Sequence, residues 1–100
     1  MEKRTPHYPF AGVQAEVAAL GAAAFTKTAM DGGRAMGLTT NEMLIVVASL
    51  TRKEFYKSMT TLADSRFWQD VYRAPTPAKR MAYAKITERD SAPVIQFKEK

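Results

Sequence analysis

The sequence contains no cysteine and only one histidine, His7, among its 100 residues. Without cysteine, disulfide bonds, thiolate metal sites and thiol nucleophiles are excluded. With one histidine and no acidic cluster near it, the chain has no spacing typical of a metal site, so we expect no metal and no cofactor. His7 follows Pro6 near the N-terminus, where we expect a mobile arm, and a Ser-His-Asp set therefore has no support.

Long hydrophobic runs are also missing. The longest, Met43–Leu50, is far shorter than a membrane span, and the N-terminal residues lead into no hydrophobic signal region. Apolar residues make up 46% of the chain and charged residues 25%, which is ordinary for a globular protein. We therefore expect a single domain over residues 1–100 that is cytoplasmic and does not associate with membranes.

Positive charge is scarce in the first half of the chain and concentrated in the second. Residues 1–50 carry four basic and four acidic side chains, whereas residues 51–100 carry eleven basic and six acidic ones. Seven of the ten aromatic residues also lie in the second half. A basic surface with interleaved aromatics suits a polyanion, and nucleic acid first. The alternative is a solvated surface that is merely basic.

The first half has helical patterns. Apolar spacing predicts a helix over Phe10–Leu20 and a second over Lys27–Met36, with Gly37 as its stop. The pair Gly32–Gly33 weakens the second prediction, because it allows the helix to end or kink there.

A third helix has the clearest start signal. Thr39 and Glu42 have the spacing of a capping box, in which each side chain accepts a hydrogen bond from the other residue's backbone N–H. The apolar run from Met43 then ends near Leu50. The run alone also fits a buried strand, and the cap decides for a helix.

The second half changes to a period of two residues, which is typical of strands. The predicted strands are Glu54–Leu62, Phe67–Arg73, Met81–Thr87 and Val94–Lys98. Short links between consecutive strands favour an antiparallel meander. Helices followed by strands predict an α+β fold, with the N-terminal helices packed on one face of a mainly antiparallel sheet.

Alternation along these strands restricts which side chains share a face. It puts Phe55 and Lys57 on one face of the first strand and Tyr56 on the other. If the strands register, Lys57, Gln69 and Tyr83 project from three strands toward one surface. The alternation permits this grouping but does not require it.

Such a group suits phosphodiester cleavage without a metal ion. Lysine balances the extra charge of a pentavalent phosphate, tyrosine near a cation exchanges a proton, and glutamine holds a phosphate or base by hydrogen bonds. The competing interpretation is a solvated lysine, a half-buried tyrosine and a surface glutamine, none with a chemical role.

Five blocks resemble a known protein family: Met1–His7, Phe55–Thr61, Trp68–Tyr72, Lys85–Thr87 and Phe97–Lys100. The sequence is similar in these blocks to the MqsR (motility quorum-sensing regulator) toxins of bacterial type II toxin–antitoxin systems. The resemblance spans the chain and is looser between Tyr8 and Leu50.

This resemblance implies a RelE-like α+β fold and an mRNA interferase, an endoribonuclease that cleaves messenger RNA at GCU-type sites and arrests growth. It implies catalytic roles for Lys57, Gln69 and Tyr83. Its implied RNA-binding residues are Met59, Arg73 and Lys98. The implied partners are mRNA and a cognate antitoxin, MqsA, which alone contacts the operator DNA.

Aromatic residues near these positions offer a base-stacking surface. Trp68 or Tyr72 would supply it, although for Trp68 we favour a place in the core. The chain departs from the family where Ser65 follows Asp64 in place of a histidine. It also departs in the loop before the tyrosine strand, where a glycine is common and this chain has Ala78–Arg80.

A second hypothesis needs no catalysis. The basic half would equally serve a nucleic-acid-binding or antitoxin-binding module with a RelE/ParE-like fold.

Overall fold

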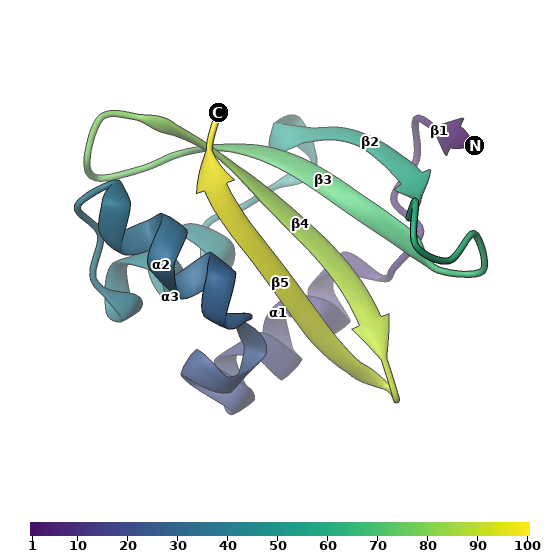
Figure 1. The fold of residues 1–100 in the computed structure, drawn as a ribbon, viewed down its shortest axis with the longest axis horizontal. Coiled ribbons are helices and arrows are strands. Elements are labelled where there is room, and N and C mark those ends of the chain that lie inside the picture. Colours follow the sequence, from purple (N-terminus) through teal and green to yellow (C-terminus); the bar gives the residue numbers. More distant parts are fainter.

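The computed structural model describes residues 1–100. Along the chain, the helices precede four of the five strands, as the colours in Figure 1 show. The elements in chain order are β1 (Glu2–Lys3), α1 (Phe10–Leu20), η1 (Gly21–Ala24), α2 (Lys27–Ala35), α3 (Thr40–Ala48), η2 (Arg52–Glu54), β2 (Phe55–Thr60), β3 (Trp68–Pro75), β4 (Met81–Arg89) and β5 (Ala92–Glu99). The short η1 and η2 segments are 3₁₀ helices. None of the helices has the length and apolarity needed to cross a membrane.

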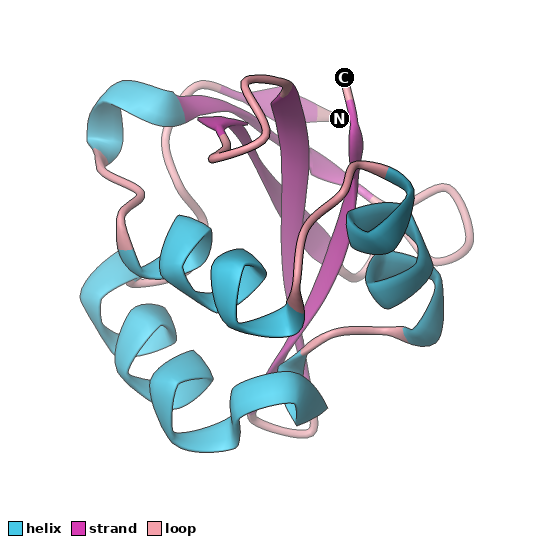
Figure 2. Cartoon of the chain, turned by 90° about the vertical axis from the view of Figure 1, so that its left-hand side faces the viewer, coloured by secondary structure: helices cyan, strands magenta, loops and turns pink.

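The five strands form one sheet in the order β1-β2-β3-β4-β5, and every neighbouring pair is antiparallel. The helices gather against one face of this sheet, which leaves the opposite face uncovered (Figure 2). The predicted α+β meander is therefore confirmed. Pro93 lies in β5 at the sheet edge, where a residue without a backbone N–H is tolerated.

The third predicted helix, α3, begins directly after Thr39, as the predicted capping box requires. In α3 the Thr39 N–H donates to Glu42 Oε1 at 2.9 Å, and the Glu42 N–H donates to Thr39 Oγ1 at 3.1 Å. These two bonds satisfy backbone donors that a helix start otherwise leaves unpaired. The helix ends at Ala48, two residues before the predicted end.

The two consecutive glycines do not break α2, which continues to Ala35. A Cβ atom on Gly32 would collide with the backbone carbonyl of Phe97, and one on Gly33 would collide with the side chain of Met43. The glycines therefore let α2 approach β5 and α3 closely. Gly37 follows the helix with a φ of +81°, as expected for a glycine stop.

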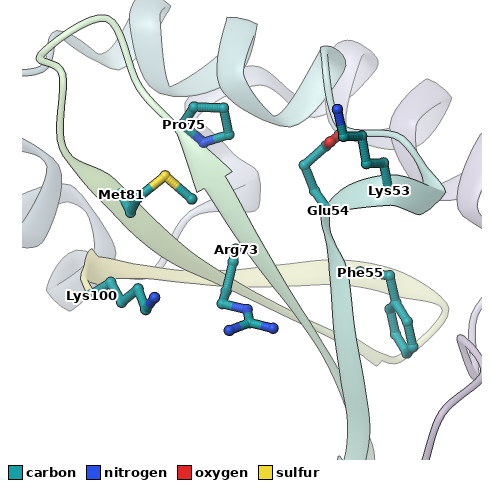
Figure 3. A pocket seen from close by; sticks show the side chains of 7 residues that line it. All are labelled: Lys53, Glu54, Phe55, Arg73, Pro75, Met81 and Lys100. Atoms are coloured by element: carbon teal, nitrogen blue, oxygen red, sulfur yellow. The ribbon is translucent and has the colours of Figure 1, made fainter.

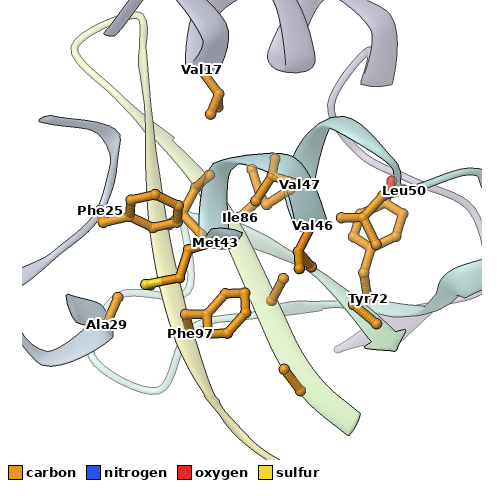
Figure 4. Close-up of a cluster of buried hydrophobic side chains, with 14 of the residues drawn as sticks. Val17, Phe25, Ala29, Met43, Val46, Val47, Leu50, Tyr72, Ile86 and Phe97 are labelled. Carbon is orange, nitrogen blue, oxygen red and sulfur yellow. The ribbon is translucent and has the colours of Figure 1, made fainter. Parts of the chain in front are cut away.

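The hydrophobic core lies between the helices and the covered face of the sheet (Figure 4). Its largest fully buried side chains include Tyr72, Phe97, Met43 and Ile86. Three alanines in the strands, Ala74, Ala82 and Ala84, have no exposed surface, and their small size leaves space for the helices. The packing covers one face only, which determines where a binding site can lie.

The N-terminal residues are docked, so the prediction of a mobile arm was wrong. Glu2 and Lys3 form β1 beside β2. The N–H groups of His7 and Tyr8 donate to the buried carboxylate of Asp70 at 2.9–3.0 Å. An ionised carboxylate is a strong acceptor, and its buried charge needs such donors. This link, which we call the Asp70 clasp, fixes the arm to the centre of the sheet.

Candidate functional site

The uncovered face of the sheet, which we call the open face, collects the polar side chains of four strands. Cross-strand neighbours on it include Met59 with Gln69, Arg73 with Tyr83, and Tyr83 with Lys98. The residues on this face are Lys57, Met59, Gln69, Val71, Arg73, Tyr83, Lys85, Gln96 and Lys98. All six residues that the sequence analysis singled out therefore lie on one face.

Three hollows follow one another along the open face. The central hollow, of about 310 Å³, is lined by Tyr56, Lys57, Met59, Val71, Tyr83, Lys85 and Lys98. The amide hollow, also about 310 Å³, is lined by Met59, Thr61, Leu62, Ala63, Gln69, Lys85, Thr87, Arg89, Val94 and Gln96. The basic hollow, about 390 Å³, is lined by Lys53, Glu54, Phe55, Arg73, Pro75, Met81 and Lys100.

The central hollow brings together Lys57 and Tyr83, as the alternation permitted, and adds Lys98. It does not include Gln69, which lies in the adjoining amide hollow. The proposed trio is thus divided between two neighbouring hollows that share Met59 and Lys85. The half-buried side chains of Lys57 and Tyr83 remain accessible there.

A β-bulge in β2 changes the predicted faces at the start of this strand. Phe55 is opposite Tyr72 and Lys57 is opposite Val71, so Tyr56 is the extra residue. Phe55 accordingly packs against the core ring of Tyr72 at a centroid distance of 5.4 Å, and Tyr56 joins the central hollow. Both assignments reverse our prediction, because strict alternation fails at a bulge.

The bulge places the Tyr56 ring next to the guanidinium group of Arg73. The Arg73 guanidinium carbon lies 4.0 Å from the centre of the Tyr56 ring, within the range of a cation–π contact. Arg73 also lines the basic hollow, where Figure 3 shows it with Met81 and Lys100. The pair therefore connects the basic hollow to the central one.

Lys57 has an acidic partner from the N-terminal strand. Its Nζ lies 3.2 Å from Glu2 Oε2, and 21% of the Lys57 side chain is exposed, compared with 51% of Glu2. An anion that entered the central hollow would compete with this carboxylate for the lysine. The docked arm thus places one acidic group at the edge of a site that is otherwise positive.

Lys85 is a site residue that the sequence analysis did not single out. It lines both the central and the amide hollow. Burial lowers the pKa of Lys85 from its ordinary value, and the nearby charges of Lys98 and Lys57 lower it further. The alternation put it on the same face as Tyr83, and it begins one of the blocks that resemble the MqsR family, but neither signal assigned it a role.

The two aromatic residues considered for base stacking do not face the hollows. Tyr72 is only 1% exposed and belongs to the core, where burial raises its pKa to about 12. Trp68, for which we favoured the core, is only half-buried at the start of β3, with the His7 ring stacked on it and Lys3 Nζ 4.3 Å from its centroid. Stacking of a base on Tyr72 is excluded by burial, and the arm covers Trp68.

The loop before β3 carries Ser65 on an exposed stretch. On either side of it, Asp64 and Arg66 form an ion pair with a separation of 2.7 Å. The Arg66 guanidinium holds the pKa of the Asp64 carboxyl at about 2.

No group of three or more histidine, aspartate or glutamate side chains is arranged to hold a metal ion. The positive charge of the open face comes from side chains: Lys57, Lys85 and Lys98 in the central hollow, and Arg73 beside them. Such fixed cations can bind a phosphodiester and stabilise added charge on it.

Comparison with known proteins identifies the family of the chain. A sequence profile of the family described as "Motility quorum-sensing regulator, toxin of MqsA" matches residues 5–99. The mRNA interferase toxin MqsR of Escherichia coli is 41% identical over 100 residues, which cover the whole of both chains. Each of these two matches is enough to establish the family of the chain. The chain belongs to the motility quorum-sensing regulator (MqsR) toxin family.

Proposed function

We propose that residues 1–100 form the toxin domain of a type II toxin–antitoxin system, and that it is an mRNA interferase preferring GCU-type sites. Family membership and the name of the Escherichia coli relative support endoribonuclease activity. The observation that carries the proposal is the central hollow, where Lys57, Lys85 and Lys98 surround Tyr83 on a face that no helix covers.

In the proposed reaction the ribose 2′-hydroxyl attacks the adjacent phosphorus. The new 2′-oxygen–phosphorus bond forms, the bond to the 5′-oxygen breaks, and the products end in a 2′,3′-cyclic phosphate and a 5′-hydroxyl. The attacking 2′-hydroxyl loses its proton and the departing 5′-oxygen gains one; Tyr83 exchanges a proton with one of these oxygens and solvent with the other. Lys57 balances the charge of the pentavalent phosphate. Gln69, one hollow away, positions the substrate by hydrogen bonds. No metal ion takes part.

RNA would enter over the basic end of the open face. Arg73 and Lys98 contact phosphates, and Met59, which lines two hollows, contacts a ribose or base. Binding replaces the Glu2 carboxylate at Lys57 by a phosphate oxygen. Because these are charge contacts, affinity should fall as salt rises.

The proposed partner that silences the toxin is a cognate MqsA-like antitoxin. The family description, which calls the family the toxin of MqsA, supports this partner. We assign the operator DNA to the antitoxin, so that the toxin reaches it only within the complex.

The proposal is tested by cleavage of a defined RNA that contains one GCU, in buffer with EDTA. Wild-type protein should cut it and leave a 2′,3′-cyclic phosphate, and a single 2′-deoxy substitution at the attacking ribose should abolish the cut. Lys57→Ala should lower the rate by about 100-fold or more, the usual loss of a fixed charge-stabilising group. Tyr83→Phe should also lower it.

Lys27→Ala is the matched control, because the Lys27 side chain is 93% exposed on α2 and lines none of the three hollows. It should cleave like wild type. Absence of cleavage by the wild type in EDTA, or full activity of Lys57→Ala, would overturn the mechanism. Persistent antitoxin binding without any cleavage would favour the non-catalytic module instead.

A further inference from the structure

We propose that the amide hollow is a nucleobase-binding subsite, which holds one unstacked base of single-stranded RNA next to the phosphate in the central hollow. This inference rests on the proposed function for the position of the RNA. It assigns base discrimination to Gln96 on β5 together with Gln69 on β3.

The order of the hollows along β4 gives the direction of the site. The alternate residues Met81, Tyr83, Lys85, Thr87 and Arg89 line first the basic, then the central and then the amide hollow. Alternate residues of a strand are about 6.8 Å apart, which neighbouring parts of one nucleotide can span. A base attached to a ribose in the central hollow therefore reaches the amide hollow.

The amide hollow has the groups that read a base edge. Lys85 is directly opposite Gln96 in the register, and Met59 is directly opposite Gln69, so both amides flank the residues shared with the central hollow. A side-chain amide offers two N–H donors and one acceptor oxygen, which complement the Watson–Crick edge of a splayed base. Thr87, only 5% exposed, adds a hydroxyl to the wall.

Apolar side chains complete a slot for a flat ring. Leu62 and Val94 line the hollow together with Met59, and the Leu62 side chain is fully exposed. An exposed leucine beside free amides is suited to cover the face of a base. The volume of the amide hollow, about 310 Å³, is at the lower end of the range for small-ligand sites.

On the open face, side-chain amides that are free to contact a base occur only in the amide hollow, as Gln14 and the basic hollow show by contrast. Gln14 is used within the fold, where its amide donates to the carbonyls of Val47, Ala48 and Leu50 at 3.0–3.1 Å. The basic hollow carries Lys53 and Lys100 and no side-chain amide. Lys85 and Arg89 make the amide hollow positive as well, but of the three hollows it alone carries side-chain amides, so a base fits the amide end.

The test measures binding rather than cleavage, so that it does not depend on catalysis. Short RNAs with a 2′-deoxy residue at the attacking ribose, and each of the four bases at each neighbouring position, are titrated against the protein. Wild type should prefer one base at one position by about 10-fold or more, as expected for a good bidentate contact. Gln96→Ala should reduce that preference to less than about 3-fold.

Gln96→Glu keeps the shape but replaces donors by acceptors, so it should shift the preference toward a base with a donor at that edge. Asn41→Ala removes an exposed amide from α3 and should leave the preference unchanged. An unchanged preference in Gln96→Ala, or no preference in the wild type, overturns the subsite. Base-selective binding by a protein that cleaves no RNA would contradict the proposed function alone.

Discussion

The two faces of the sheet are built from the same strands and differ by one residue in register. On the covered face, Phe97 and Ile95 are buried against the helices. On the open face, their neighbours Lys98 and Gln96 are exposed. A one-residue slip would exchange the two sets, so packing of the core fixes the position of each polar group. Along each strand, substitutions of covered-face residues should therefore lower stability, and substitutions of the alternating open-face residues should impair RNA binding or cleavage.

The largest effect should come from the adjacent pair Phe97 and Lys98. Phe97→Ala removes a ring that is 2% exposed and packs edge-on against Phe25, and should lower the free energy of unfolding by about 3–5 kcal/mol. Lys98→Ala should change that free energy by less than about 0.5 kcal/mol but reduce cleavage. Denaturant unfolding followed by circular dichroism measures the first, and the RNA assay the second.

Ile95→Val provides a milder form of the same test if Phe97→Ala does not fold. Ile95 has no exposed surface, and the change should lower the free energy of unfolding by about 0.5–1.5 kcal/mol. A stability loss of similar size in Lys98→Ala would break the distinction between the faces.

Asp70 is the exception on the covered side, because it is a charged residue that is only 1% exposed. Asp70→Ala leaves the N–H groups of His7 and Tyr8 without their acceptor and should lower the free energy of unfolding by about 1.5–3 kcal/mol. Because the arm carries the Glu2 carboxylate that competes with a phosphate for Lys57, its release should also lower the KM for RNA. Urea midpoints and cleavage rates are the measurements; unchanged stability would show that the clasp contributes nothing.

Tyr56 tests the bulge. Tyr56→Ala removes the ring beneath Arg73, a contact worth about 0.5–1 kcal/mol at an accessible site, and should raise the KM for RNA by about 2–5-fold. Tyr56→Phe keeps the ring and should restore the wild-type KM. A fall in kcat with KM unchanged would instead place Tyr56 in the chemistry.

The smallest effect, of opposite sign, concerns Lys85. Burial and the neighbouring lysines hold the pKa of folded Lys85 below the ordinary value of 10.5, so its charge opposes folding at pH values below the lowered pKa. Lys85→Met should raise the free energy of unfolding at pH 7 by less than about 0.5 kcal/mol, since solvent screens a partly exposed charge. This gain should decline as pH rises through the lowered pKa toward 10.5.

The measurement is a set of denaturant midpoints from pH 7 to pH 10.5, with Lys27→Met as the matched control. RNA cleavage by Lys85→Met should fall at the same time. A loss of stability in Lys85→Met would contradict the conclusion that the positive charge of Lys85 destabilises the fold.

Local signals in the sequence were sufficient for α1, α2 and α3 and for the order of β2 to β5, whereas β1 was not predicted. The Thr39–Glu42 box set the start of α3. Alternation only permitted Lys57, Gln69 and Tyr83 to share a face, and the register of the sheet puts them there. Their roles came from the family resemblance and stay predictions.

The errors had long-range causes. No local pattern marks the bulge at Tyr56 or the contact of Asp70 with residues more than sixty positions earlier. The division of the site into hollows depends on side chains from four strands, so neither Lys85 nor Gln96 was recognised. Gly32–Gly33 was interpreted from backbone preference, whereas packing against β5 decides its role.

The Asp70 clasp also makes the docking of the arm observable without RNA. It joins residues 62 and 63 positions apart, and closing such a long loop is slow compared with pairing of adjacent strands. The arm should therefore be among the last segments to order during folding. Native-state hydrogen exchange at the backbone amides of His7 and Tyr8 then reports, in the free protein, how often the arm detaches from the sheet.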